Sequence, residues 1–122
     1  LVEALEADYK ETFTEAELDA VKGSTTIMAM NNIYYRFIHL ASDKEYGKMP
    51  AGLRMNIIGN PGIEKVDFEL YALAVSAING CGMCMDAHVS VVEKAGISKQ
   101  GVQSTIRIAS VVHATAQALT IG

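Results

Sequence analysis

The segment NGCGMCMDAH, residues 79 to 88, holds the side chains best suited to chemistry. Its two cysteines, Cys81 and Cys84, are separated by two residues, and His88 follows four positions after the second. The chain contains no other cysteine. On a helix, which turns about 100° per residue, these three side chains fall within roughly 60° of one face. Such a set can form a redox-active dithiol, bind a metal, or pack without reacting.

The position of the cysteines on their helix favours reactivity. We expect a helix that takes in both cysteines and continues to Ala95, so that they occupy its first turn. Free backbone N–H groups and the positive end of the helix dipole favour thiolate over thiol there. His88 lies one turn beyond Cys84 and could act as its base. Helix position alone favours Cys81 as the more exposed of the two thiols.

Glu69 is the carboxylate best placed to orient His88. If Asn79 and Gly80 turn the chain into an antiparallel helix pair, Glu69 lies roughly 15 Å along one helix and His88 roughly 10 Å along the other, so the two could meet. Because this face is predicted to be buried, Glu69 is a candidate proton acceptor with a raised pKa. The residues that share its face are Ala72, Leu73 and Ser76.

The elements that position these residues are all predicted to be helices, since apolar residues recur at helical spacing without sustained alternation. Thr14 and Glu17 form a capping box that opens a helix towards Leu40, loosened at Gly23. The other expected elements are an initial helical segment, a loop at 42–52, a short helix at 53–59, a turn at 60–62, a helix from Phe68 to about Ile78 capped by Asp67, and a last helix capped by Ser98.

Length and composition predict one globular domain over residues 1–122. Half of the residues are hydrophobic, enough for one core and, in a chain this small, an argument for an oligomer. The net charge of -4 and the absence of basic clusters argue against nucleic acid or a membrane surface as a partner. No apolar run approaches the roughly 20 residues that span a bilayer. We therefore expect a cytoplasmic protein.

The arrangement Glu-x11-Cys-x-x-Cys-x-x-x-His resembles that of the alkyl hydroperoxidase D proteins, within the carboxymuconolactone decarboxylase-like superfamily of all-helical domains. The segments MAMNNIYYR (28–36) and GLRMNIIGNPGIEKVDFELYALAVSAINGC (52–81) are similar to that family as well, and the likeness extends to about Leu119. Members of the family usually carry further helices ahead of this region. Because this chain begins at Leu1 rather than at a methionine, we expect that it lacks them.

The resemblance implies a disulfide reductase and thiol peroxidase with no bound cofactor, in which Cys81 and Cys84 cycle between dithiol and disulfide. Cys84 would meet an alkyl hydroperoxide, Cys81 would resolve the sulfenic acid, and Glu69 and His88 would relay the proton. Electrons would come from dihydrolipoamide on a lipoyl-carrying acyltransferase and pass to a peroxiredoxin partner. A ring-shaped homotrimer is implied too. Relatives often place a histidine where this chain has Met83.

Several other interpretations compete with this one. Cys81 and Cys84 could be inert core residues. A structural zinc site needs four ligands, and with His88 the segment supplies only three, so we expect no dedicated metal site. The domain could also be a non-catalytic helical assembly module, or a decarboxylase-like lyase of the same fold. The methionines at 28, 30 and 55 are interpreted as packing, and no residue set indicates which organic group a peroxide would carry.

Overall fold

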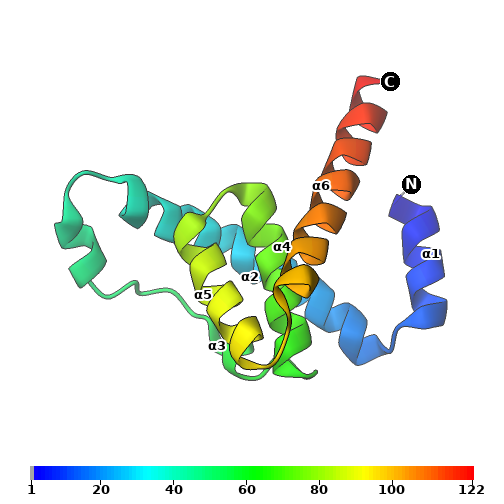
Figure 1. The fold of residues 1–122 in the computed structure, drawn as a ribbon, viewed down its shortest axis with the longest axis horizontal. Coiled ribbons are helices and arrows are strands. Elements are labelled where there is room, and N and C mark those ends of the chain that lie inside the picture. The colour runs from blue at the N-terminus through cyan, green and yellow to red at the C-terminus, as the bar shows by residue number, and fades with distance from the viewer. Residues whose placement is uncertain (1) are drawn as a thin grey trace.

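The computed structural model describes residues 2–122, and every regular element in that range is a helix (Figure 1). The all-α prediction is confirmed. The elements, in chain order, are α1 (Val2–Thr12), α2 (Glu15–Leu40), the 3₁₀ helix η1 (Lys44–Lys48), α3 (Asn56–Gly59), α4 (Lys65–Asn79), α5 (Gly82–Lys94) and α6 (Lys99–Ile121).

Helix α4 is the centre of the fold, because α2, α5 and α6 all pack against it. Figure 1 shows α4 and α5 as an antiparallel pair, with the long helix α2 crossing the pair and α6 leading away from it to the C-terminus. The largest fully buried apolar side chains come from these elements and are Met28, Phe68, Leu73 and Val92. The core therefore lies where α2 crosses the α4–α5 pair.

Helix α2 begins as the sequence predicts. The Thr14 side chain accepts a hydrogen bond from the Glu17 backbone N–H, and the Glu17 carboxylate accepts one from the Thr14 N–H, each at 3.1 Å. The predicted loosening at Gly23 is wrong, since α2 continues unbroken to Leu40. Gly23 has another use, because the Ile57 side chain of α3 occupies the space that a Cβ there would need.

The α4–α5 pair forms as predicted, with differences at its helix starts. Asp67 does not cap α4, which begins earlier and has Glu64 at its N-cap without a side-chain bond. At the other end Gly80 adopts a left-handed conformation (φ 74°) that ends α4, and Cys81 caps α5. Because the predicted helix began at Phe68, one turn of α4 was missed. Ser98 caps α6 as expected.

No helix among residues 2–122 is long and apolar enough to cross a bilayer.

The left-handed conformation of Gly80 predicts a specific sensitivity to substitution. Gly80→Ala should lower the free energy of unfolding by about 1 kcal/mol, because a Cβ is strained at positive φ. Gly59→Ala is the matched control, since no other atom lies near its added Cβ and its φ is not positive. Denaturant unfolding measures both variants. Equal stability of the two would show that Gly80 is not required by the turn.

Candidate active site

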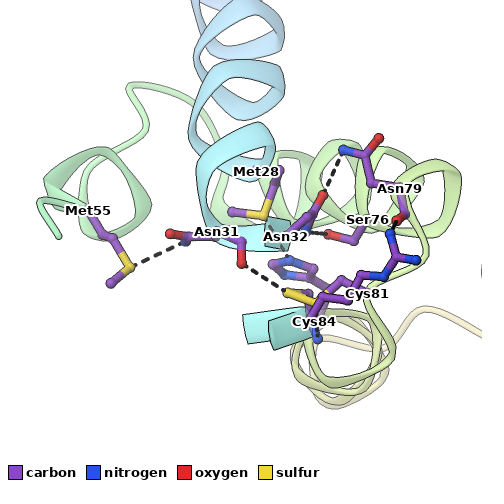
Figure 2. The surroundings of a disulfide bond; sticks show 10 residues. Met28, Asn31, Asn32, Met55, Ser76, Asn79, Cys81 and Cys84 are labelled. Atoms are coloured by element: carbon purple, nitrogen blue, oxygen red, sulfur yellow. Dashed lines mark hydrogen bonds between the residues drawn. A yellow bond between two sulfur atoms is a disulfide. The ribbon is translucent and has the colours of Figure 1, made fainter. Parts of the chain in front are cut away.

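The α4–α5 pair brings the four predicted site residues to one end of the core. Glu69 lies on the buried face of α4, and Cys81, Cys84 and His88 come from the first half of the α5 segment. Cys81 and Cys84 form a disulfide, with their Cα atoms 5.3 Å apart (Figure 2). The structure is therefore that of the oxidised protein.

The two cysteines differ in their surroundings. Cys81 is the N-cap of α5 rather than a residue of its first turn, and its sulfur accepts the backbone N–H of Cys84 at 3.3 Å. Cys81 is completely buried, whereas Cys84 is 7% exposed and lines a pocket. The expectation that Cys81 is the more exposed thiol is wrong, because the turn at Gly80 folds it inward between the two helices.

Glu69 and His88 meet across the helix pair, as their spacing predicts. The Nδ1 atom of His88 lies 2.6 Å from Oε2 of Glu69, and both side chains are buried. A carboxylate can only accept, so this contact places a hydrogen on Nδ1. The pair fixes the orientation of the imidazole ring one turn away from Cys84.

Lys65 is a member of the site that sequence reasoning missed. Its Nζ atom lies 3.1 Å from Oε1 of Glu69. Lys65 precedes Glu69 by one turn of α4. It was missed because the predicted helix began at Phe68, which left Lys65 outside the helix that carries Glu69. The carboxylate of Glu69 thus has a hydrogen-bond partner on each oxygen.

These partners reverse the predicted direction of the Glu69 pKa. Burial alone would raise that pKa, but hydrogen bonds from His88 and Lys65, together with their positive charge, lower it below the ordinary value of 4.5. The sequence-based expectation of a raised pKa is wrong, because it counted burial but neither the hydrogen bond from His88 nor the one from Lys65. Glu69 is therefore charged at neutral pH.

Met28 is a second contact that was missed. Its sulfur lies 3.2 Å from Nε2 of His88, and its side chain is almost fully buried. A thioether sulfur, like a carboxylate, only accepts hydrogen bonds. Both ring nitrogens thus face groups that can accept a hydrogen bond, and these contacts hold the ring in place.

A polar network holds α2 against the end of α4. The Asn32 amide donates to the Ser76 hydroxyl at 2.9 Å, and the Asn79 amide donates to the Asn32 oxygen at 3.0 Å (Figure 2). Arg36 donates to the carbonyl of Asn79 at 3.4 Å. The sequence pattern placed Ser76 only on the same helix face as Glu69, without this role. The network fixes the turn that leads into Cys81.

A pocket of about 300 Å³ opens beside Cys84. It lies between α2, α3 and α5, and its lining is largely apolar, with the Cys84 sulfur and the His88 ring on one side. The backbone carbonyl oxygen of Asn31 lies 3.9 Å from that sulfur. Within residues 2–122, no cluster of three or more histidine, cysteine or acidic side chains is arranged to hold a metal ion. A small molecule entering this pocket would reach Cys84 before Cys81.

Comparison with known proteins finds one matching family and several similar proteins that share one name. The sequence pattern of the carboxymuconolactone decarboxylase family matches residues 44–121. The chain is 57% identical over 117 residues to a Coxiella burnetii protein named alkyl hydroperoxide reductase AhpD, a match that covers 96% of this chain. Proteins of the same name from Azorhizobium caulinodans and Rhodopseudomonas palustris are 53% and 51% identical over 98% and 100% of this chain. The chain spans 66 to 67% of the length of these curated relatives.

The two partners of Glu69 predict how its titration depends on Lys65. Lys65→Met removes one hydrogen bond and one positive charge from the carboxylate, so the pKa of Glu69 should rise towards or above 4.5. Isotope-edited NMR of the Glu69 carboxyl carbon should show a titration midpoint at higher pH than in the unmodified protein.

The free energy of unfolding should also depend less on pH in this variant. Because the pKa of Glu69 is lowered in the folded protein, its charge contributes stability above pH 4.5, and this stability is lost as the pH falls through the folded pKa. Lys65→Met should therefore lose less stability on acidification than the unmodified protein. Lys48→Met is the control, because Lys48 pairs with Glu45 on an exposed surface. An unchanged Glu69 midpoint in Lys65→Met would show that the lysine does not set the charge of the carboxylate.

Proposed function

Because the chain belongs to the carboxymuconolactone decarboxylase family, we propose that it is a thiol-dependent peroxidase and disulfide reductase that cycles Cys81 and Cys84 between dithiol and disulfide. The observation that carries the proposal is the buried Glu69–His88 pair beside a Cys-x-x-Cys disulfide that opens onto a pocket. The names of the relatives support the same class of reaction. The substrate that oxidises the dithiol is an alkyl hydroperoxide, which is reduced to an alcohol. The role of the protein is antioxidant defence.

In the oxidative half of the cycle, Cys84 reacts first because it lines the pocket. His88 accepts the Cys84 proton, and the thiolate attacks the terminal oxygen of the hydroperoxide. An S–O bond forms, the O–O bond breaks, and the proton held by His88 passes to the departing alkoxide, which leaves as an alcohol. Cys84 is now a sulfenic acid. Cys81 attacks its sulfur, the disulfide forms and the hydroxyl leaves as water.

In the reductive half, the buried position of Cys81 decides which sulfur is attacked. A dithiol donor reaches Cys84 from the pocket, and Cys81 departs as a thiolate. The Cys84 backbone N–H already points at the Cys81 sulfur, and the helix N-terminus favours negative charge there. The second thiol of the donor then releases Cys84, so that two electrons and two protons enter the site.

The donor and acceptor proteins follow the same thiol chemistry. We propose dihydrolipoamide on a lipoyl-carrying acyltransferase as the dithiol donor, and the disulfide of a peroxiredoxin as an acceptor besides hydroperoxide. A cycle that must return to the dithiol suits a reducing compartment such as the cytoplasm. A lyase or a purely structural assembly module would have no use for a disulfide coupled to a buried histidine and carboxylate.

We also propose that the protein acts as a homotrimer. Large apolar side chains lie exposed along α2 and along the outer half of α6, where every residue from 110 to 122 is exposed. A monomer rarely leaves such a surface uncovered, and further copies of the chain are the simplest cover. The most exposed of these residues are Ile33, Leu40, Ile108, Val111, Leu119 and Ile121.

The order of the cysteines can be tested by trapping the sulfenic acid. Cys81→Ser should form a peroxide-dependent sulfenic acid at Cys84 that a dione reagent captures, because no resolving thiol remains. Cys84→Ser should form none, since Cys81 is buried. Mass spectrometry identifies the modified residue. A sulfenic acid found only in Cys84→Ser would reverse the assignment.

The Glu69–His88 relay predicts non-additive losses. Glu69→Gln and His88→Phe should each lower hydroperoxide turnover by about 100-fold, and the double variant should be little worse than the poorer single one. Glu93→Gln is the control, because Glu93 pairs with Lys99 away from the pocket. Steady-state turnover at neutral pH is measured for all four. Losses that simply multiply would refute a shared relay.

The oligomer prediction can be tested on the unmodified chain. Sedimentation velocity at micromolar concentration should give a particle of three times the 13.1 kDa mass of one chain. Val111→Asp should shift the particle towards the monomer, because a charge would then be buried at the interface. A monomeric unmodified protein at this concentration would contradict the proposal.

A further inference from the structure

Helix α3 forms one wall of the pocket described above, and its own packing holds it weakly. Met55, at its N-cap, and Ile58 line the pocket. None of the residues of α3 is buried. The Ile57 side chain lies beside Gly23 of α2. The Asn31 amide of α2 donates to the Met55 sulfur at 3.3 Å (Figure 2). So short a helix, without a buried side chain, is expected to open locally at little cost.

The C-terminal end of α3 has a further anchor in Lys65. The Lys65 Nζ atom donates to the backbone carbonyl of Ile58 at 3.3 Å and to Oε1 of Glu69 at 3.1 Å. An ammonium group carries three hydrogens, so it can serve both acceptors at once. Ile58 and Glu69 both line the pocket, whereas Lys65 does not. The lysine, whose side chain is 54% exposed, therefore joins the wall of the pocket to the buried carboxylate from outside.

The stability of α4 does not explain a lysine at this position. Lys65 is the first residue of α4, where the helix dipole disfavours a positive charge. Its pair with Glu69 has the lysine on the N-terminal side, which is the weaker order for two residues four apart. The lysine is also half exposed, and ion pairs that water reaches contribute little to the free energy of unfolding. What the position does provide is the bond to Ile58, across the turn at 60–62.

We propose that Lys65 is a positioning residue whose ammonium holds α3 in place as the pocket wall by bridging the Ile58 carbonyl and the Glu69 carboxylate. The specificity that follows from this role rests on the proposed peroxidase function. The organic group of a hydroperoxide would meet Met55 and Ile58, whereas hydrogen peroxide has no such group. A fixed wall lowers the cost of binding the organic group, because less of the protein has to be ordered when the substrate enters. Lys65 thus favours hydroperoxides with an apolar group over hydrogen peroxide.

The charge of Glu69 is what holds the lysine in this conformation. A lysine side chain loses rotamer entropy when it is fixed, and an attraction has to offset that loss. The Glu69 carboxylate is 3% exposed and charged at neutral pH, so it accepts a charge-assisted hydrogen bond from the ammonium. The carboxylate that orients His88 therefore also anchors the wall of the pocket.

NMR of the oxidised protein tests the anchor without any turnover. The backbone amides of residues 56–59 should have order parameters of about 0.85 in the unmodified protein and below about 0.6 in Lys65→Met. The Ile58 carbonyl carbon should shift in Lys65→Met, since it loses its donor. Lys65→Arg should keep α3 ordered, because arginine retains the charge and the donors. Lys48→Met removes an exposed lysine paired with Glu45 and is the control that should leave α3 unchanged.

A second variant shows whether the carboxylate holds the lysine. In Glu69→Gln the amide accepts a weaker hydrogen bond, so the order parameters of α3 should fall as they do in Lys65→Met. The double variant should show little further loss, because both changes break the same bridge. Unchanged order in Glu69→Gln would overturn the bridging role. If Glu69→Gln does not fold, the comparison of Lys65→Met with Lys65→Arg still decides whether the lysine anchors α3.

Steady-state kinetics at neutral pH test the consequence for specificity. The measured quantity is kcat/KM for cumene hydroperoxide divided by kcat/KM for hydrogen peroxide. Any effect of the lysine on the Glu69–His88 pair acts on both substrates and cancels in this ratio. Lys65→Met should lower the ratio about 5-fold, through a higher KM for cumene hydroperoxide, because binding must then order α3. Lys65→Arg and Lys48→Met should keep the ratio of the unmodified protein.

Three results would overturn the inference. They are unchanged order parameters in Lys65→Met, an equal loss of order in Lys65→Arg, and a loosened α3 in Lys65→Met with an unchanged ratio of the two substrates. If α3 loosens in Lys65→Met but the unmodified protein reduces neither peroxide, the proposed function is refuted and the anchoring role stands.

Discussion

The hydrogen bond between Glu69 and His88 joins α4 to α5 in the interior, and the chemistry of the site depends on it. Glu69 is 3% exposed, and a buried carboxylate is costly unless its oxygens are paired. Here His88 occupies one oxygen and Lys65 the other. Removing one partner from a buried pair typically costs about 3 to 5 kcal/mol. If α4 and α5 shifted along one another, the Glu69 carboxylate would lose its hydrogen bond from His88 and remain buried without it.

This constraint would give the proposed disulfide cycle a fixed scaffold. Gly80 ends α4 in a left-handed turn, and the network of Asn32, Ser76 and Asn79 holds that turn against α2. Cys81 is thus held at the N-terminus of α5 by contacts that do not involve its bond to Cys84.

Sequence patterns were sufficient for features that depend on neighbours along the chain. The capping box at Thr14, the turn at Gly80 and the meeting of Glu69 with His88 all follow from local spacing or from one short connection between helices. The patterns failed where the third dimension decides. Met28 and Asn31 reach the site only because α2 crosses the helix pair, and no spacing rule relates α2 to α5.

The errors at Lys65 and Cys81 have a common origin in helix boundaries. Starting α4 at Phe68 removed the turn that sets Lys65 beside Glu69, so one of the two hydrogen bonds that lower the carboxyl pKa was missed. Placing Cys81 inside α5 rather than at its cap made it look accessible. An error of one to three residues at a helix end thus contributed to the wrong pKa direction for Glu69 and reversed the expected exposure of the two thiols.

The difference between the two cysteines would give the proposed cycle its direction. In that proposed cycle Cys84 faces the pocket where substrate and donor would arrive, and it would need His88 to accept its proton because the Asn31 backbone carbonyl beside it offers no stabilisation to a thiolate. The Cys81 sulfur accepts the backbone N–H of Cys84 at a helix N-terminus, which would stabilise its thiolate without a base. A sulfur that is accessible and one that departs readily are the two requirements of thiol–disulfide exchange. The pocket makes the Cys84 sulfur accessible, and the helix N-terminus allows the Cys81 sulfur to depart readily. Both halves of the proposed cycle can therefore pass through Cys84.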